Sequence, residues 1–207
     1  MSEIILDPVQ RRLFMESQGL SYISRSVYKD VPIFSRDQKG SPYYQDNKEE
    51  FEVLHKEYHR KIEEAIMAPV SIRRVSDDVG HGLFAEALMK PGAYLSEYAG
   101  LVQPGEDLVL DPETCDGSKG FDTDYTWDYP DAWYEDVLYE VNAGTMGNEL
   151  RYINHSFEPN LAVEHTLVAN RWVIFFVALQ YIKAGSQLTV DYGEEYWSGG
   201  FRELILF

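Results

Sequence analysis

Residues 147–160 read GNELRYINHSFEPN and carry the strongest signal in the chain. Taken alone, Asn154 would be a turn-forming residue and His155 a hydrogen-bonded histidine of the core. Two shorter segments flank this one at a distance, GHGLFA at 80–85 and QLTVDYG at 187–193. Closely spaced glycines suit main chain that approaches a ligand, although GHG alone would be a tight turn. Tyr192, taken alone, would be a core aromatic at a strand end. Taken together, the three segments change this interpretation.

The residue pattern between these segments predicts short strands and turns. RWVIFFVAL at 171–179 is apolar, β-branched and aromatic, as expected for a buried strand. The turns at 90–92 and 183–185 each lead into a strand-like run, AYLSEY and SQLTV. Regular alternation of strands and helices is absent, which argues against a doubly wound parallel sheet. We therefore predict a mostly β domain with short helices, an α+β fold.

The first 69 residues have a different pattern. From 46 to 68, apolar residues recur at three- and four-residue spacing with charged residues between them, which predicts an amphipathic helix. Asp46 and Glu49 resemble a capping box at its start, and Pro69 fits its end. We expect residues 1–69 to form an N-terminal helical appendage packed on the domain that follows.

The composition bounds the class of protein. The chain has 207 residues, 44% of them hydrophobic, which is enough for one compact domain and too little for two full-sized ones. We expect no transmembrane helix and no signal peptide, because no apolar run spans a bilayer and the first residues lack a basic segment before an apolar core. The sequence does not indicate the cellular compartment of the protein. Cys115 is the single cysteine, which excludes an intramolecular disulfide and a zinc site built on several thiolates.

The charge of the chain limits the kinds of partner that it is expected to bind. Eighteen basic and 35 acidic residues give a net charge of −17 at pH 7, which argues against general binding to nucleic acid or to a membrane surface. Residues 106–140 hold twelve acidic side chains and a single basic one, Lys119. This acidic stretch is either a solvated face or a surface that attracts a basic partner, and composition leaves both interpretations open.

The three segments, together with SEYAG at 96–100, resemble the SET domain of protein lysine methyltransferases in order, content and spacing. That family has a GxG loop, an NHSxxPN segment and a DYG close to the end of the domain. The resemblance covers residues 70–197. It implies several short β-sheets and a C-terminal pseudoknot where 147–160 and 187–193 meet. It also implies that residues 198–207 form a short C-terminal segment that closes a lysine channel.

The resemblance implies transfer of a methyl group from S-adenosyl-L-methionine to a lysine of a basic protein such as a histone. Free lysine has a pKa of about 10.4, so a site must desolvate and orient the amine to make it a nucleophile. Tyrosines suit this task, since their hydroxyls bond an amine and their rings wall an apolar channel. The alternative is a non-catalytic SET-like module that binds basic peptides, although the retained Tyr192, Asn154 and GxG turn favour the enzyme.

The residues that the resemblance implies for cofactor binding lie in all three segments: Gly80, His81, Gly82, Asn154, His155 and Tyr192. Tyr192 matches the tyrosine at the family's methyl-transfer centre and is the first candidate catalytic residue. Tyr125, in DTDYTWDY, lies where the family has a tyrosine lining the cofactor or lysine channel, and is the second.

Several positions depart from the family pattern or from other motifs. Phe157 stands where many members have a zinc-binding cysteine, so the resemblance is to a small, zinc-free type and no metal site is expected. Val190 stands where some members have an aromatic that limits the number of methyl groups, which leaves that number open. His55 and His59 lie four residues apart, but Glu57 is displaced from the place a metalloprotease requires, so we expect exposed helix histidines.

Overall fold

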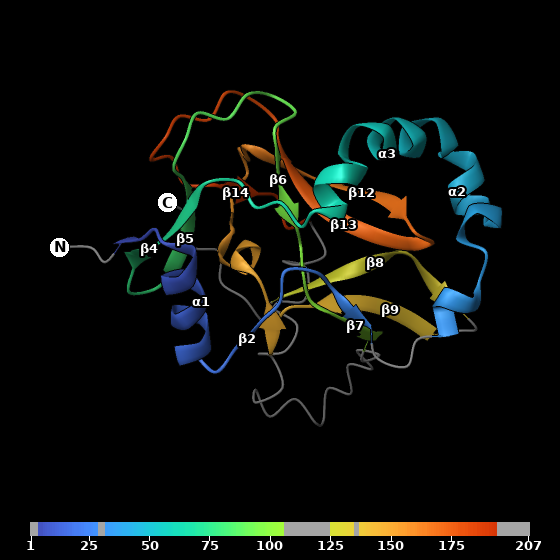
Figure 1. Ribbon diagram of the computed structural model, residues 1–207, viewed down its shortest axis with the longest axis horizontal. Helices are drawn as coiled ribbons and strands as arrows, with labels where there is room; N and C mark the ends of the chain where they lie inside the picture. The colour runs from blue at the N-terminus through green and yellow to red at the C-terminus, as the bar shows by residue number, and fades with distance from the viewer. Residues whose placement is uncertain (1–3, 29–31, 106–124, 135–136, 194–207) are drawn as a thin grey trace.

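The computed structural model describes residues 4–28, 32–105, 125–134 and 137–193 (Figure 1). Its helices are α1 (Pro8–Ser17), α2 (Pro42–Asp46) and α3 (Lys48–Glu63), with 3-10 turns η1 (Pro32–Ser35), η2 (Gln38–Gly40) and η3 (Glu149–Tyr152). Its strands are β1 (Ile4–Ile5), β2 (Ser21–Tyr22), β3 (Val27–Tyr28), β4 (Val70–Ser76), β5 (Gly80–Ala85), β6 (Tyr94–Glu97), β7 (Leu101–Pro104), β8 (Thr126–Tyr134), β9 (Val137–Asn142), β10 (Met146–Gly147), β11 (Asn154–His155), β12 (Leu161–Val168), β13 (Arg171–Ala178) and β14 (Thr189–Val190).

These strands form several small sheets in place of one large one. Their orders are β1-β4-β5, β12-β13-β6 and β3-β7-β9-β8, with the pairs β2-β10 and β11-β14. The predicted class, mostly β with short helices and several short sheets, is confirmed. The buried strand expected at 171–179 is β13, and the runs AYLSEY and SQLTV contain β6 and β14.

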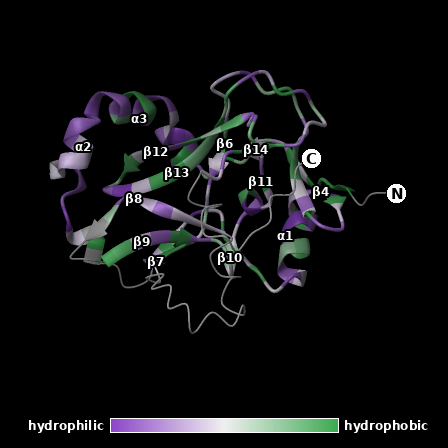
Figure 2. Ribbon diagram, turned by 180° about the vertical axis from the view of Figure 1, so that it is seen from behind, coloured by the Kyte–Doolittle hydropathy of each residue, from purple (hydrophilic) through white to green (hydrophobic). Residues whose placement is uncertain are grey.

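Strand β13 is apolar on both faces because both faces are covered. Val173, Phe175 and Val177 belong to one buried cluster, which includes Tyr58 and Ile62 of α3. The alternate residues of the strand belong to the main core. Figure 1 shows α3 on one side of β12 and β13 and the β8–β9 hairpin on the other, and Figure 2 shows the hydrophobic colour along β13. A strand buried on two sides reads as a continuous apolar run.

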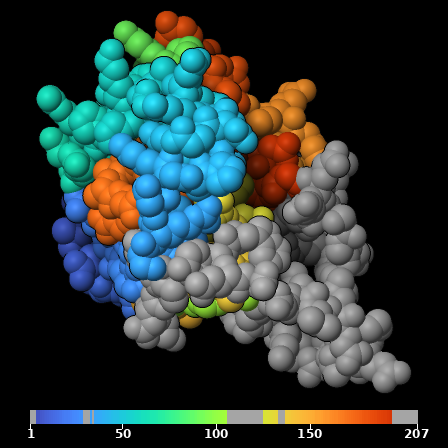
Figure 3. Space-filling view, turned by 90° about the vertical axis from the view of Figure 1, so that its right-hand side faces the viewer, coloured from blue at the N-terminus to red at the C-terminus, as the bar shows by residue number. Residues whose placement is uncertain are grey.

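Helix α3 confirms the amphipathic helix predicted between 46 and 68, but its start differs. Asp46 ends α2, and Asn47 precedes α3 without a side-chain capping bond, so the expected capping box is wrong. The cause is a separate helix start upstream, where the Ser41 hydroxyl accepts from Tyr44 N at 3.1 Å. Figure 3 shows α2 and α3 forming the outer surface of this side of the molecule.

The two histidines of α3 are partly buried, so the expectation that they are exposed is wrong. The His55 ring lies against β12 and donates from Nδ1 to Leu167 O at 3.0 Å. The His59 ring stacks on it at 4.8 Å and donates from Nδ1 to His55 O. Packing of α3 on β12 therefore gives both rings a structural role.

The described part of residues 1–69 contains the helices α1, α2 and α3 and also adds strands to the sheets. β1 pairs with β4, β2 runs parallel to β10, and β3 runs parallel to β7. The segment is thus hydrogen-bonded into the domain at several places. The boundary at residue 70 stays a prediction. Residues 194–207 and most of the acidic stretch lie outside the described ranges, and no helix within those ranges is long and apolar enough to cross a membrane.

The expected meeting of 147–160 with 187–193 is present. β11 pairs in parallel with β14, with Asn154 opposite Thr189 and His155 opposite Val190. Asn160 reinforces the pairing, because its amide donates to Gln187 O at 2.8 Å and its side-chain oxygen accepts from Thr189 N at 3.0 Å. Two of the three sequence segments therefore form one structural unit.

Acid should weaken the packing of β12 because His165 is partly buried there. Burial lowers the pKa of His165 to about 4 from 6.5, and its Nε2 lies 2.6 Å from the Tyr43 hydroxyl. As the pH falls, this histidine is protonated in the unfolded chain before it is protonated in the folded protein. The stability present above pH 6.5 is therefore lost as the pH falls toward 4. We expect a loss of about 2–3 kcal/mol in the free energy of unfolding, measured by urea denaturation across this range. His165→Gln should lose most of this dependence and His59→Gln should keep it; equal slopes in all three proteins would contradict the assignment.

Candidate active site

The GHG segment opens strand β5, and its two glycines meet different constraints, one of backbone conformation and one of space. Gly80 has φ = +78°, in the left-handed region that favours glycine, and ends the turn from β4. Gly82 faces the meeting point of the chain segments: a Cβ placed there would lie 2.8 Å from Val75 Cγ2 and 3.1 Å from Asn154 Nδ2. Main chain is thus brought against a side-chain amide, which a larger residue would prevent.

The three candidates Gly82, His81 and Asn154 form a cradle of polar groups. Asn154 Nδ2 donates to His81 O at 3.3 Å, across 73 positions of sequence. Carbonyls, amide N–H groups and a carboxamide at such spacing can hold both the ammonium and the carboxylate of an amino acid. The structure therefore brings these predicted residues together as the resemblance implied.

His155 connects this cradle to Tyr192. Its Nδ1 accepts a bond from Tyr192 N at 3.1 Å and lies 3.6 Å from Asp191 Oδ1. Burial lowers the pKa of His155, and the Asp191 carboxylate opposes that effect in part. A neutral ring that accepts at Nδ1 orients the chain at 191–193, so His155 has a positioning role here.

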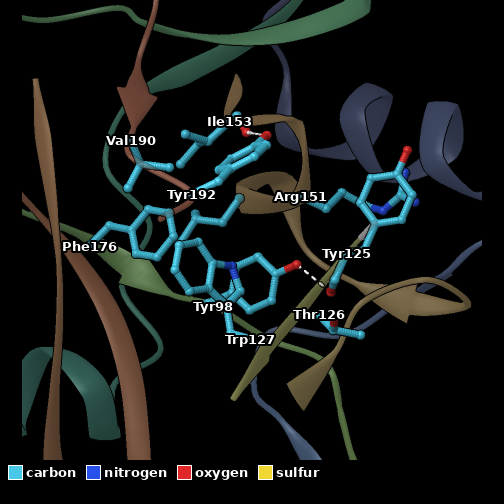
Figure 4. A pocket seen from close by; sticks show the side chains of 10 residues that line it. Tyr98, Tyr125, Thr126, Trp127, Arg151, Ile153, Phe176, Val190 and Tyr192 are labelled. Atoms are coloured by element: carbon cyan, nitrogen blue, oxygen red, sulfur yellow. Dashed lines mark hydrogen bonds between the residues drawn. The ribbon is translucent and has the colours of Figure 1, made fainter. Parts of the chain in front are cut away.

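Next to the cradle lies a cavity with aromatic walls and about 390 Å³ of space, part of it open to solvent (Figure 4). Its aromatic lining comes from Tyr98, Trp127, Phe176 and Tyr192, with Tyr125 at one end. The Trp127 ring makes edge contacts with Phe176 at 5.8 Å and with Tyr192 at 6.4 Å, and Tyr98 stacks on Phe176 at 5.9 Å. Such walls suit an apolar chain that ends in an amine.

The hydroxyl of Tyr192 is held by a backbone carbonyl in the cavity lining. It donates to Ile153 O at 2.6 Å, a bond drawn in Figure 4. Ile153 lines the cavity and directly precedes Asn154, which bonds the glycine segment. The backbone at 153–155 thus separates a polar cradle from an aromatic cavity, and the Tyr192 hydroxyl lies where they meet.

Tyr125 lines the same cavity but lies apart from Tyr192. Its ring packs under the Arg151 guanidinium at 3.8 Å, and in Figure 4 it points away from the aromatic cluster. Its carbonyl is the more central group, accepting from the Tyr98 hydroxyl at 2.7 Å and from Ala143 N at 2.9 Å. The geometry places Tyr125 as a wall and anchor, and a catalytic role for it stays a prediction.

The sequence prediction did not place the aromatic residues Tyr98, Trp127 and Phe176 in the site. The sequence signal that could have indicated them is the period of two along a strand. Trp127 and Tyr129 share a face of β8, and Phe176 points to the opposite face of β13 from Phe175. Which face points into a site depends on how the sheets pack, and that is not a local property. Within the described ranges no group of three His, Cys, Asp or Glu side chains could hold a metal ion.

Comparison with known proteins identifies this arrangement. The family model described as the SET domain matches residues 80–193, more than half of the chain. The chain belongs to the SET-domain family. The match includes every candidate site residue, from Gly80 in the glycine segment to Tyr192 beside the cavity.

Relatives of this SET domain are larger proteins. The histone-lysine N-methyltransferase Su(var)3-9 of Drosophila melanogaster is 30% identical over 142 residues, covering 65% of this chain and 21% of that protein. The histone-lysine N-methyltransferase EHMT1 of Homo sapiens is 30% identical over 146 residues, covering 67% of this chain and 10% of that protein. The chain thus spans about a fifth or less of the length of these relatives.

Solved structures extend the comparison to three dimensions. The structure of ctPRC2 in an autoinhibited conformation bound to S-adenosylmethionine matches with a TM-score of 0.52 and 28% identity, covering 63% of this chain and 16% of that chain. The active polycomb repressive complex 2 in the stimulated state matches with a TM-score of 0.51 and 25% identity, over 65% of this chain and 16% of that one. Both confirm the SET fold.

Proposed function

We propose that this SET domain is a protein-lysine N-methyltransferase that uses S-adenosyl-L-methionine. The observation that carries the proposal is the junction of the polar cradle at Gly82 and Asn154 with the aromatic cavity, at the Tyr192 hydroxyl. The names of the relatives, and the S-adenosylmethionine bound to a structurally similar protein, support the same activity.

The residues of the cradle fit an amino-acid cofactor. Gly80, His81 and Gly82 would offer main-chain groups to its methionine end, Asn154 its carboxamide, and His155 its backbone. The structural sign of this fit is the close approach of the Gly82 main chain to the Asn154 amide, which an added Cβ would meet at 3.1 Å. When bound, S-adenosylmethionine supplies an electrophilic methyl group on a positively charged sulfur.

The aromatic cavity would receive the lysine. Tyr98, Trp127 and Phe176 would wrap its aliphatic chain and remove water from the amine, which lowers the amine pKa and favours the neutral nucleophile. Ile153 O and the Tyr192 hydroxyl would accept or share hydrogen bonds with that amine and direct its lone pair toward the methyl group. Tyr125 would complete the wall, and residues 198–207 would close the channel.

We also propose that the partner is a basic, lysine-rich protein, such as a histone, and that the chain does not bind nucleic acid directly. The net charge of −17 supports both statements, since an acidic chain repels phosphates and attracts lysine-rich segments. The acidic stretch at 106–140 would contribute to this attraction. Residues 70–197 would form the catalytic unit, with 1–69 packed on it.

The test combines cofactor binding with methyl transfer. Calorimetry with S-adenosylhomocysteine measures binding, and labelled S-adenosylmethionine with core histones, separate recombinant histones and a lysine-rich non-histone protein measures transfer. We expect saturable binding and label on lysine in at least one protein, located by mass spectrometry. A matched substrate with its modified lysine changed to arginine should remain unlabelled.

Each of the other possible results would contradict a different part of the proposal. Binding of basic peptides without transfer to any lysine would favour the non-catalytic module. Absence of S-adenosylhomocysteine binding would refute the cofactor assignment itself. Label that survives the lysine-to-arginine substitution at every site would refute lysine as the acceptor.

A further inference from the structure

Helix α1 lies outside the matched SET segment and contacts His81 of the cradle and Tyr152, two residues before Asn154. The Phe14 ring lies 4.8 Å from the His81 ring on β5 and 6.0 Å from the Tyr152 ring on η3. His81 and Tyr152 meet each other less closely, at 6.3 Å. Figure 1 shows α1 beside β4 and β5. One side chain of the N-terminal segment therefore packs against two elements that bring the cradle together.

A buried ion pair fixes α1 in this position. Arg11 Nε lies 2.8 Å from Glu149 Oε1, and the two side chains are 6% and 1% exposed. Arg11 also donates from Nη1 to Val70 O at 2.8 Å, so it joins η3 to β4 as well. A buried pair is costly to break because the remaining charge loses its partner. The helix is thus anchored to the strand before the glycine segment and to the turn before Asn154.

The direct bond across the cradle is weak by comparison. Asn154 Nδ2 and His81 O are 3.3 Å apart, at the long end for a hydrogen bond. The distance between β5 and β11 therefore depends on what packs around them. The Phe14 ring supplies that packing from the side of α1.

We propose that Phe14 is a positioning residue for the cofactor: it sets the spacing between His81 and Asn154, and α1 is thereby coupled to cofactor binding. This inference rests on the proposed use of S-adenosylmethionine. It extends that function to a helix that lies outside the SET match at 80–193. Because coupling between two sites is reciprocal, cofactor binding should in turn stabilise α1.

The test compares Phe14→Ala with Phe14→Leu, which keeps apolar volume, and with Leu13→Ala, a change at an exposed neighbour on the same helix. For Phe14→Ala we expect the Kd for S-adenosylhomocysteine and the KM for S-adenosylmethionine to rise about tenfold, with kcat at saturating cofactor within about twofold. Phe14→Leu should give an intermediate Kd, and Leu13→Ala should match the parent. A lower melting temperature with unchanged Kd and KM would show a structural role alone and overturn the proposal.

Hydrogen exchange on the unmutated protein provides the second arm, in case Phe14→Ala does not fold. Addition of S-adenosylhomocysteine should slow amide exchange in α1 more than in α3. Helix α3 packs on the face of β13 opposite to Phe176, which lines the cavity. Unchanged exchange in α1 would overturn the coupling. If the unmutated protein binds no S-adenosylhomocysteine, the proposed function itself is wrong. If it binds S-adenosylhomocysteine but transfers no methyl group, the Kd and exchange measurements still test the coupling of α1 to cofactor binding.

Discussion

Tyr192→Phe should lower kcat for methyl transfer by about 10²- to 10³-fold, the loss typical of removing one oriented hydrogen-bonding group from a transition state. The hydroxyl at the junction of cradle and cavity is lost, while the ring keeps its edge contact with Trp127 at 6.4 Å. The affinity for S-adenosylhomocysteine should stay within a few-fold. Steady-state kinetics at saturating cofactor, with calorimetry on the same preparation, measure both quantities.

Loss of the same hydroxyl also leaves Ile153 O without the 2.6 Å bond, so the variant should be less stable by about 1–3 kcal/mol. The matched control is Tyr181→Phe, since that tyrosine is 66% exposed and lies outside the cavity lining. It should retain both turnover and stability. Parental kcat in Tyr192→Phe, with the fold intact, would remove Tyr192 from the mechanism.

Gly82→Ala should weaken cofactor binding by about 10- to 100-fold, as expected when a well-packed site must absorb an extra methyl group at a cost of about 1–3 kcal/mol. The added Cβ would lie 2.8 Å from Val75 Cγ2 and 3.1 Å from Asn154 Nδ2, so both the Val75 side chain and the amide must shift. Titration with S-adenosylhomocysteine measures the change in Kd. The KM for S-adenosylmethionine should rise in parallel.

Gly105→Ala provides a control of the same chemistry, because the nearest atom to its added Cβ is Leu138 O at an ordinary 3.5 Å. That variant should bind cofactor as the parent does. If Gly82→Ala also keeps the parental Kd, the glycine segment does not hold the cofactor, and the site must lie elsewhere on the domain.

Local pattern in the sequence was sufficient for the fold class, whereas the polar residues of the candidate site were predicted from the resemblance to the SET domain. Alternation and apolar runs identified β6, β13 and β14, since the period of a strand is a property of neighbouring residues. The motif at 147–160 and the DYG at 191–193 predicted the pairing that became β11 and β14. Gly82 and Asn154 were predicted as cofactor-binding residues from the same resemblance, and the structure places them next to each other.

The aromatic cavity and the role of α1 depend on packing over long distances. Trp127 and Phe176 are ordinary strand aromatics in the sequence, and they become cavity walls because β8 and β13 pack face to face. Tyr125 lies close to this wall in sequence but turns onto Arg151, and local pattern does not reveal that contact. Phe14 and Arg11 reach His81 and Glu149 across long stretches of the chain. Motifs therefore specify which groups a site needs, whereas the relative placement of sheets and helices specifies which apolar residues enclose it.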